Sequence, residues 1–328
     1  MTKIFFFFES MKLMFYFFFR YHFFRKKILL LPIFRSSSIL HSMQNLQTQT
    51  KELQWRYYNH ALLPTCAPHE DADINVLKDK TIWKQFKPNR PLFACWTTHF
   101  DCGYETGWWY CILDKPFNID ALSSNRRSKI KQAIKNFEVR VIEVKEYANQ
   151  MFDVHQSAWK TYHKTGTFDT ERKCFCKEVE RWEGLVFGAF DKESNQLAAY
   201  YRVKVNPSYI ELVTIKSNPN FEKKRVNLAL MFFVYNYFSK DIEQGKYLCG
   251  GSRNIYHQTN FQEFREKNFG FRKGYTHLHI QYAPSIASIV KFIYPFRKII
   301  KKLSFTFTNQ ISGVLLMEEI CRNQRKMV

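Results

Sequence analysis

The order of apolar segments between residues 139 and 282 constrains the fold more than any other feature of this chain. Segments with a period of two, such as "LAAYYRVKV" (197–205), predict strands, and segments with helical spacing predict amphipathic helices. We expect strands at 139–144, 184–191, 197–205, 209–216, 247–251 and 275–282, and helices at 147–163, 174–182, 227–239 and about 260–269. This alternation predicts a fold of the α/β (α+β) class, with a mixed sheet flanked by helices.

Two of these segments carry further structural information. The helix at 227–239, "NLALMFFVYNYFS", is apolar nearly all round, so we expect it to be buried. The helix near 260–269 is followed by Gly270, which suits a left-handed position, and by the apolar Phe271. Between these helices, Gly250 and Gly251 lack the lysine and the spacing of a phosphate-binding P-loop, so they predict a sharp turn out of the sheet.

The segment 43–138 is rich in aromatic residues and turns. We expect strands at 92–98 and 107–113, followed by the helix "LSSNRRSKIKQAIKNF" with Ile130 and Ala133 facing inward. The many Arg and Lys residues of this helix predict either a solvated face or a groove for a nucleic acid or phosphate, and we prefer the solvated face.

Both ends of the chain are strongly basic. Residues 1–42 contain seven Lys/Arg and one Glu, and residues 291–328 contain eight Lys/Arg and two Glu, so each carries +6 of the total +21. The Phe-rich residues 1–42 are interrupted by charges, so we rank translated upstream sequence before a membrane-surface segment, and a true anchor last. For the basic tail 285–328 we expect helices packed on the domain, with contact to an anionic membrane surface as the alternative.

The cysteine pattern argues against a metal centre. The eight cysteines include no Cys-x-x-Cys pair, and Cys174-Phe-Cys176 alone is too sparse for zinc. Scattered cysteines in a large chain predict reduced thiols in a cytoplasmic protein, and we expect Cys249 to be a buried, inert thiol rather than a nucleophile. His277 and His279 would share a strand face, but two histidines without a third ligand make a weak metal site.

A succession of motifs resembles the GNAT-like acyltransferases, in particular the Fem type and related bacterial proteins. The stretches are "RRSKIKQAIKN", "VHQSAWKTY", "LVFGAF…LAAYYRV", "NLALMFFVYNYF" and "GGSRN…NFQEFREKNFGF", and the resemblance covers about residues 85–283. It implies a GNAT-like mixed central sheet with a partial-GNAT or α+β lead-in. We therefore divide the chain into a basic extension (1–42), an aromatic-rich subdomain (43–138), a GNAT-like acyltransferase domain (139–284) and a basic helical tail (285–328).

The resemblance places the acyl-donor site before the buried helix, where this chain reads "FEKKRVNLAL". Ordinary members of the family have a Gly-x-Gly there for the pyrophosphate of acetyl-CoA, whereas Fem-type enzymes lack these glycines and use aminoacyl-tRNA. Free N–H groups at a helix start can still receive a phosphate, and Asn227 is a good N-cap. We expect acyl-CoA or aminoacyl-tRNA as co-substrate, with no tightly bound cofactor and no metal, and donor contacts from Lys223, Lys224, Arg225, Val226 and Asn227.

The acyl-transfer chemistry needs a donor to the carbonyl, a base and an acid. By resemblance, backbone N–H groups near 213–216, with Val213 and Ile215, would receive the carbonyl. Glu211 in an apolar strand is the candidate base, unless a Lys or Arg on a neighbouring strand pairs with it. One of Tyr200 and Tyr201 should be core while the other lines the cleft. The remaining candidates are Tyr201, Tyr256 and His257 for catalysis, and Gly251 and Ser252 for the cleft wall.

The function that these features predict is acyl or aminoacyl transfer to an amine, on a sugar or cell-envelope precursor. The two substrates would meet between strands 209–216 and 247–251. The alternatives are a catalytically inactive GNAT-fold binding protein and, on charge alone, a nucleic-acid-binding protein. We expect a cytoplasmic location, with peripheral membrane contact through the basic ends as an alternative.

Overall fold

The computed structural model describes residues 54–58, 60–79, 81–85, 90–162, 170–255, 261–302 and 306–326. The chain divides into two units, Met1–Glu52 and Leu53–Val328, and all described residues belong to the second. Tyr256 and His257 lie outside the described residues.

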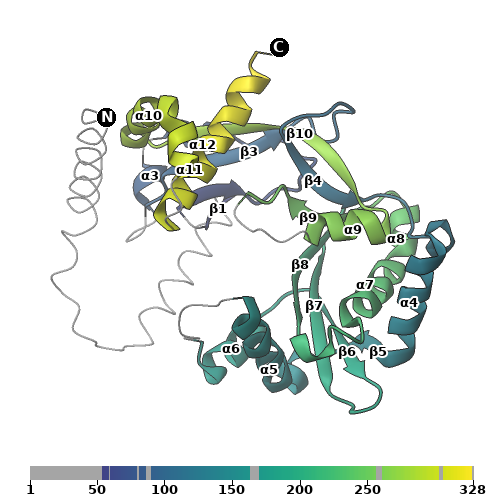
Figure 1. The fold of residues 1–328 in the computed structure, drawn as a ribbon. Coiled ribbons are helices and arrows are strands. Elements are labelled where there is room, and N and C mark those ends of the chain that lie inside the picture. Colours follow the sequence, from purple (N-terminus) through teal and green to yellow (C-terminus); the bar gives the residue numbers. More distant parts are fainter. Residues whose placement is uncertain are drawn as a thin grey trace, which may run out of the picture. The chain divides into compact units, whose positions relative to one another are not determined.

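One sheet of ten strands runs through the described unit, in the order β1-β2-β3-β10-β4-β9-β8-β7-β6-β5 (Figure 1). The pairs β2–β3 and β8–β9 are parallel and the other neighbours are antiparallel, so the predicted mixed sheet is confirmed. The strands are β1 (Trp55–Tyr58), β2 (Ala61–Pro64), β3 (Phe93–Thr98), β4 (Trp108–Leu113), β5 (Phe137–Val141), β6 (Leu185–Asp191), β7 (Leu197–Val205), β8 (Ile210–Ser217), β9 (Leu248–Ser252) and β10 (Arg272–Tyr282).

Strand β10 joins the two halves of this sheet. Its first part, 272–276, pairs with β4, and its second part, 277–282, pairs with β3. Strand β4 lies between β9 and β10, although it precedes both by more than a hundred residues in the chain. The boundary that we expected at residue 138 therefore does not separate two sheets, because strands from both sides of it alternate in one.

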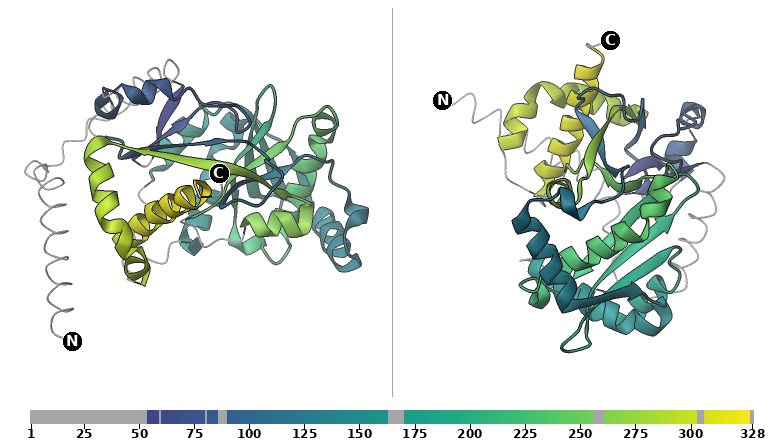
Figure 2. Two further views of the ribbon diagram at one scale, coloured as in Figure 1. Left: turned by 90° about the horizontal axis from the view of Figure 1, so that it is seen from above. Right: turned by 90° about the vertical axis from the view of Figure 1, so that its right-hand side faces the viewer.

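Helices cover both faces of the β5–β8 part of the sheet (Figures 1 and 2). On one face, α4 (Ser124–Asn136), α7 (Val226–Tyr237) and α9 (Phe261–Phe269) share one apolar core with β7 and β8. On the opposite face, α5 (Val144–Tyr162) and α6 (Arg172–Val179) pack over β6 and β7 in a second core. Successive residues of a strand point to opposite faces, so Tyr201 belongs to the first core and Tyr200 to the second.

The apolar helix predicted at 227–239 is α7, and it is buried as expected. Seven of its side chains are buried, including Leu230, Met231 and Val234, each fully enclosed. Burying one such side chain contributes roughly 1.5–3 kcal/mol, so this helix is a main source of stability for the surrounding sheet. After it come α8 (Ser239–Glu243), β9 and α9, and Gly270 has the predicted left-handed conformation with φ of 73°.

The basic tail is helical, as predicted. It comprises α10 (Pro284–Ile293), η5 (Tyr294–Phe296), α11 (Arg297–Lys302) and α12 (Thr306–Gln324). Helix α12 packs on β10, where the amide of Leu278 donates to the Gln324 side chain and the Cys321 thiol donates to the Leu278 carbonyl. Among the described helices, none combines the length and the apolarity needed to cross a membrane.

Shorter elements complete the described unit. Helices η2 (Asn75–Lys78) and α3 (Ile82–Gln85) follow the β1–β2 hairpin, η3 (Ile119–Ala121) precedes α4, and η4 (Pro219–Phe221) precedes α7. All eight cysteines are free thiols, as expected.

Candidate functional site

The two parallel strands β8 and β9 separate shortly after they begin. Their pairing consists of Ile210 with Leu248 and Glu211 with Cys249, whereas β8 continues to Ser217 and β9 to Ser252. We call the diverging stretches, 212–217 of β8 and 250–252 of β9, the strand fork. It lies between the two strands where we expected the substrates to meet, and α7 begins after the open end of β8.

A β-bulge marks the start of the fork. Arg202 of β7 is opposite Thr214 and Val203 is opposite Leu212, so Val213 has no partner on β7. Its side chain is 38% exposed. A bulge takes backbone groups out of the regular ladder and re-aims them. This places an irregular backbone segment at the site where the resemblance implies a donor to the acyl carbonyl.

Glu211 is the last residue of β8 that pairs with β9, and its side chain is half-buried. Within the described chain, the Glu211 carboxylate forms no ion pair and accepts no hydrogen bond. Lys204, directly opposite on β7, instead lies 3.7 Å from Glu183. Lys204, the lysine on the neighbouring strand, therefore forms no ion pair with Glu211.

Arg202 is the other basic residue near Glu211 on this face, and it is also engaged elsewhere. Its guanidinium stacks on the ring of Trp182 at 4.8 Å and donates to the carbonyl of Glu183. Burial lowers the pKa of Arg202, while the charge of Glu211 opposes that shift. The two side chains thus interact through charge without direct contact.

Cys249, opposite Glu211, is a buried thiol. Burial raises its pKa to about 12, so it remains protonated at neutral pH. It belongs to an apolar cluster with Ile112 and Tyr247. The expectation of an inert thiol agrees with these surroundings.

The two tyrosines of β7 differ from what we expected. Both Tyr200 and Tyr201 have no exposed surface, so neither lines an open cleft. Tyr201 faces the α7 side because the alternation of the strand puts Tyr200 against α5 and α6. Its hydroxyl accepts a hydrogen bond of 2.6 Å from Arg265, so its position is that of a core residue.

Arg265 of α9 is a residue that the sequence reasoning missed. It is 3% exposed and has no carboxylate partner among the described residues. Its Nη1 donates to the Gly250 carbonyl at 2.9 Å, and its guanidinium lies 4.5 Å from the ring centre of Phe261. The spacing could have revealed it, because Arg265 lies four residues after Phe261 and four before Phe269, on the apolar side of the helix.

Gly250 and Gly251 form a bulge in β9 opposite Cys111 of β4. A Cβ on Gly250 would lie 2.2 Å from Nη1 of Arg265, so a larger residue at this position would displace the Arg265 guanidinium. Gly251 has φ of 90° and is exposed, which again favours glycine. The Ser252 carbonyl accepts a hydrogen bond from Gln262 of α9, so the predicted wall residues are held from the α9 side.

The predicted donor residues before α7 are mostly engaged. Lys224 bonds Asp191 at 2.8 Å and Glu193 at 2.7 Å. Arg225, with φ of 66°, occupies the N-cap position and donates to Gln132. The prediction that Asn227 is the N-cap is wrong, since the helix begins at Val226. Lys223 is exposed and forms no ion pair or side-chain hydrogen bond with another described residue.

The α5 side of the fork carries a second feature that the sequence did not indicate. Lys216, near the end of β8, is half-buried, and burial lowers its pKa. His155 of α5 has a pKa lowered by burial and by the positive charge of Lys216. Ile215, between the bulge and Lys216, packs against the opposite core and therefore points away from α5.

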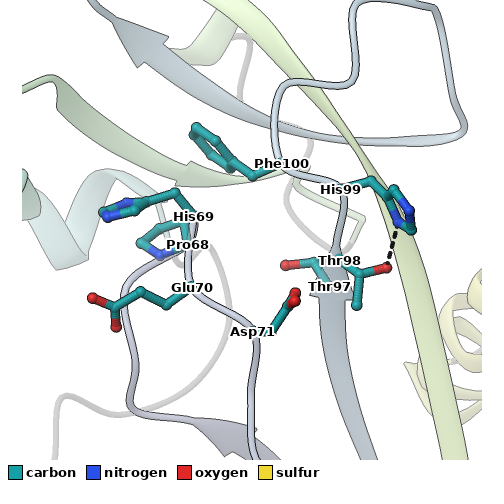
Figure 3. A pocket seen from close by; sticks show the side chains of 8 residues that line it. All are labelled: Pro68, His69, Glu70, Asp71, Thr97, Thr98, His99 and Phe100. Atoms are coloured by element: carbon teal, nitrogen blue, oxygen red, sulfur yellow. Dashed lines mark hydrogen bonds between the residues drawn. The ribbon is translucent and has the colours of Figure 1, made fainter.

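A cavity of about 390 Å³ lies between the loop after β2 and the end of β3 (Figure 3). Figure 3 shows the Asp71 carboxylate pointing toward Thr97, while Glu70 points away from it. His69, also in the lining, hydrogen-bonds Tyr247 at 2.8 Å, and the lining residue Phe100 packs in the cluster of Cys249. The cavity therefore adjoins the apolar cluster behind Glu211, but its lining includes no residue of β8 or β9.

Three histidines meet at the far end of β3. The rings of His99 and His277 are 4.9 Å apart, and His279 bonds the Thr98 hydroxyl at 2.7 Å. In the part of the chain that the structure describes, no group of three or more His, Cys, Asp or Glu side chains is placed to hold a metal.

Comparisons with known proteins give structural neighbours only. No family model matches the chain, and no curated protein matches it. Among solved structures, FemX aligns with a TM-score of 0.44 and 11% identity over 73% of this chain and 85% of its own. The C-terminal domain of a lysylphosphatidylglycerol synthetase from Agrobacterium fabrum gives 0.42 and 8% over 73% and 83%. A tandem GNAT protein from the clavulanic acid pathway gives 0.39 and 9% over 70% and 77%.

These neighbours are GNAT-fold proteins, which is the fold that the resemblance implied. Their identities and TM-scores are too low to carry an argument about substrate or activity.

Proposed function

We propose that the protein transfers an acyl or aminoacyl group to an amine at the strand fork. The observation that supports this most is the combination of a bulged backbone at Val213 with the free carboxylate of Glu211, two residues earlier on the same strand. A backbone N–H can polarise a carbonyl, and a carboxylate can take a proton from an attacking amine. Both functions occur at the point where β8 and β9 part.

In the proposed reaction, the carbonyl oxygen of the donor accepts a hydrogen bond from the backbone near Val213. Glu211 removes a proton from the ammonium of the acceptor, and the amine nitrogen then attacks the carbonyl carbon. The tetrahedral intermediate collapses, the bond to the leaving group breaks, and the nitrogen loses its second proton to the solvent. Tyr256 and His257 remain the predicted acids that protonate the leaving group.

The donor is acyl-CoA or aminoacyl-tRNA. The contacts of Lys224 and Arg225 reduce the charge available to a pyrophosphate, so of the cationic donor residues we assign only Lys223 to a donor phosphate. The free backbone N–H groups of Val226 and Asn227 in the first turn of α7 complete this proposed contact. We place the reaction in the cytoplasm, where eight free thiols are compatible with a reducing compartment.

The same engagement of Lys224 and Arg225 favours a second candidate, a GNAT-fold binding protein without catalysis. Such a protein would retain the fork as a binding surface. It would bind a donor or an acceptor without turnover.

Both candidates can be tested by incubating the full chain with a labelled donor and a set of acceptor amines. The donor is radiolabelled acetyl-CoA or tRNA charged with labelled amino acids, and the acceptors are amino sugars and other primary amines. Label should appear on an amine with one donor class, and Glu211→Gln should lower kcat by about 10²–10⁴-fold. Glu183→Gln is the matched control, because Glu183 is an exposed carboxylate nearby that is paired with Lys204.

Thermal stabilisation by a donor without any transfer would favour the binding protein. If neither donor stabilised the protein and neither transferred label to an amine, both candidates would be excluded. Equal losses in the two glutamate variants would remove the specific role of Glu211.

A further inference from the structure

Two helices of the C-terminal tail present lysines and large apolar side chains together. Phe292 of α10 is 58% exposed and Ile299 of α11 is 45% exposed. The exposed lysines beside them are Lys291, Lys298, Lys301 and Lys302. We call these six residues the α10–α11 surface.

The exposure is selective, because the same helices also bury apolar residues. Val290 and Ile293 of α10 and Ile300 of α11 are each less than 9% exposed and fix the helices to the domain. Phe292 and Ile299 are therefore not part of the face that packs inward. Figures 1 and 2 show both helices at the β3–β10 end of the sheet, away from α5 and α6.

The charge of this surface is of one sign. The segment 284–302 contains five Lys/Arg and no Asp or Glu. Arg297 is paired with Glu319 of α12, whereas none of the four lysines has an ion pair among the described residues. An anionic bilayer has an apolar hydrocarbon interior and negatively charged head groups at its surface. Large apolar side chains surrounded by unpaired lysines are complementary to both.

We propose that the α10–α11 surface docks the protein on an anionic lipid membrane, with Phe292 and Ile299 entering the interface and the four lysines facing the lipid head groups. The chain's own residues 1–42 fit less well as the occupant, since they also carry a net +6. A second copy of the chain would bring lysines against lysines. The proposal does not depend on the proposed function.

Helix α4 provides a control within the same molecule. Lys129 and Lys131 are exposed and also lack an ion pair in the described chain. No large exposed apolar residue accompanies them on that helix, where Ile130 and Ala133 are buried. Reversing two charges there changes the net charge as much as reversing two on α11, but away from the proposed surface.

Co-sedimentation of the full chain with vesicles tests the proposal. The protein should sediment with phosphatidylcholine vesicles that contain phosphatidylglycerol, and not with phosphatidylcholine alone. K298E/K301E and F292S/I299S should each weaken this binding by about tenfold or more, because each removes one of the two contributions. K129E/K131E should bind as the unchanged protein does, and circular dichroism checks the fold of every variant.

Four outcomes would overturn the proposal: no binding to anionic vesicles at moderate salt, equal binding to neutral ones, equal loss in the α4 control, or full binding by K298E/K301E. The last would assign the membrane contact to residues 1–42. A dimer in analytical ultracentrifugation that F292S/I299S converts to a monomer would instead assign this surface to self-association.

Discussion

Arg265 donates a hydrogen bond of 2.9 Å to the carbonyl of Gly250, where β9 diverges from β8. Its second terminal nitrogen, Nη2, donates to Tyr201 on β7, so one buried side chain connects α9 with two strands of the sheet. A buried cation without a carboxylate is costly unless its hydrogen bonds are made well. The fork therefore depends on a residue that does not itself face the proposed substrates.

Replacing Gly250 by alanine should destabilise the protein by about 2–3 kcal/mol, because the added Cβ overlaps Nη1 of Arg265 and breaks its bond to the backbone. The rings around Arg265 limit its retreat. Urea denaturation measures the loss. Gly251→Ala is the control, since its Cβ meets nothing within 4 Å and only the positive φ costs about 1 kcal/mol. A larger loss at Gly251 would contradict this account.

Arg265→Met should be tolerated better than Arg265→Ala. Methionine fills much of the space and removes the buried charge, leaving mainly the unsatisfied groups of Gly250 and Tyr201, at about 1–3 kcal/mol. Alanine adds a cavity, so the expected loss is about 3–5 kcal/mol. The midpoints of chemical denaturation compare the two variants, and an equal loss would show that packing around the side chain is unimportant.

Lys223 and Lys224 are adjacent but should respond differently to substitution by alanine. Asp191 is 2% exposed. Burial raises its pKa, but hydrogen bonds from Lys224 and Ser194 outweigh burial and lower the pKa overall. Lys224→Ala therefore leaves a buried carboxylate without its cationic partner. We expect Lys224→Ala to lower the melting temperature and Lys223→Ala to leave it unchanged. Lys223→Ala should instead weaken donor stabilisation. The reverse pattern in differential scanning fluorimetry would refute the assignment.

Acid should destabilise the end of β3 and β10. Burial lowers the pKa of His277 and His279, and the charge of His99 lowers both further. At His279, the charge of Arg325 also lowers the pKa, while the charge of Asp71 raises it. The unfolded chain then binds more protons than the folded one below the ordinary histidine pKa of about 6.5. The contribution of these two histidines to the free energy of unfolding should be fully present above about pH 6.5. It should fall as the pH drops below that value toward their lowered pKa values in the folded protein.

The double variant His277→Gln/His279→Gln should lose part of this pH dependence. Tyr104 and Thr98, which bond the two rings, can still contact the glutamine amides. Unfolding free energies measured between pH 5 and 8 would show a flatter curve. An unchanged curve would mean that other groups govern the acid response.

The sequence predicted local structure well and side-chain partners poorly. The strand at 197–205 coincides with β7, and the buried helix is α7 within two residues, because both patterns are strong and local. The pairing of Lys224 with Asp191 and Glu193 could not be read from the sequence, since it joins residues about thirty positions apart. The sequence also could not show that the Glu211 carboxylate has no ion pair, because Lys204, directly opposite on β7, pairs with Glu183 instead.

The arrangement of the sheet was equally beyond local patterns. The strands at 92–98 and 107–113 were predicted correctly as β3 and β4, but nothing in their residues indicates that β4 lies between β9 and β10. The bulges at Val213 and at Gly250–Gly251 also depend on the partner strand. Tyr201 was misplaced because its neighbour Arg265 comes from a distant helix.

The central position of β4 has a consequence for how the chain is made. This strand leaves the ribosome early, yet both of its neighbours, β9 and β10, are synthesised near the end. Until then its apolar residues have no sheet to join and its backbone edges are open to other chains. We therefore expect the nascent protein to need protection by chaperones, and fragments that begin after β4 to aggregate rather than fold.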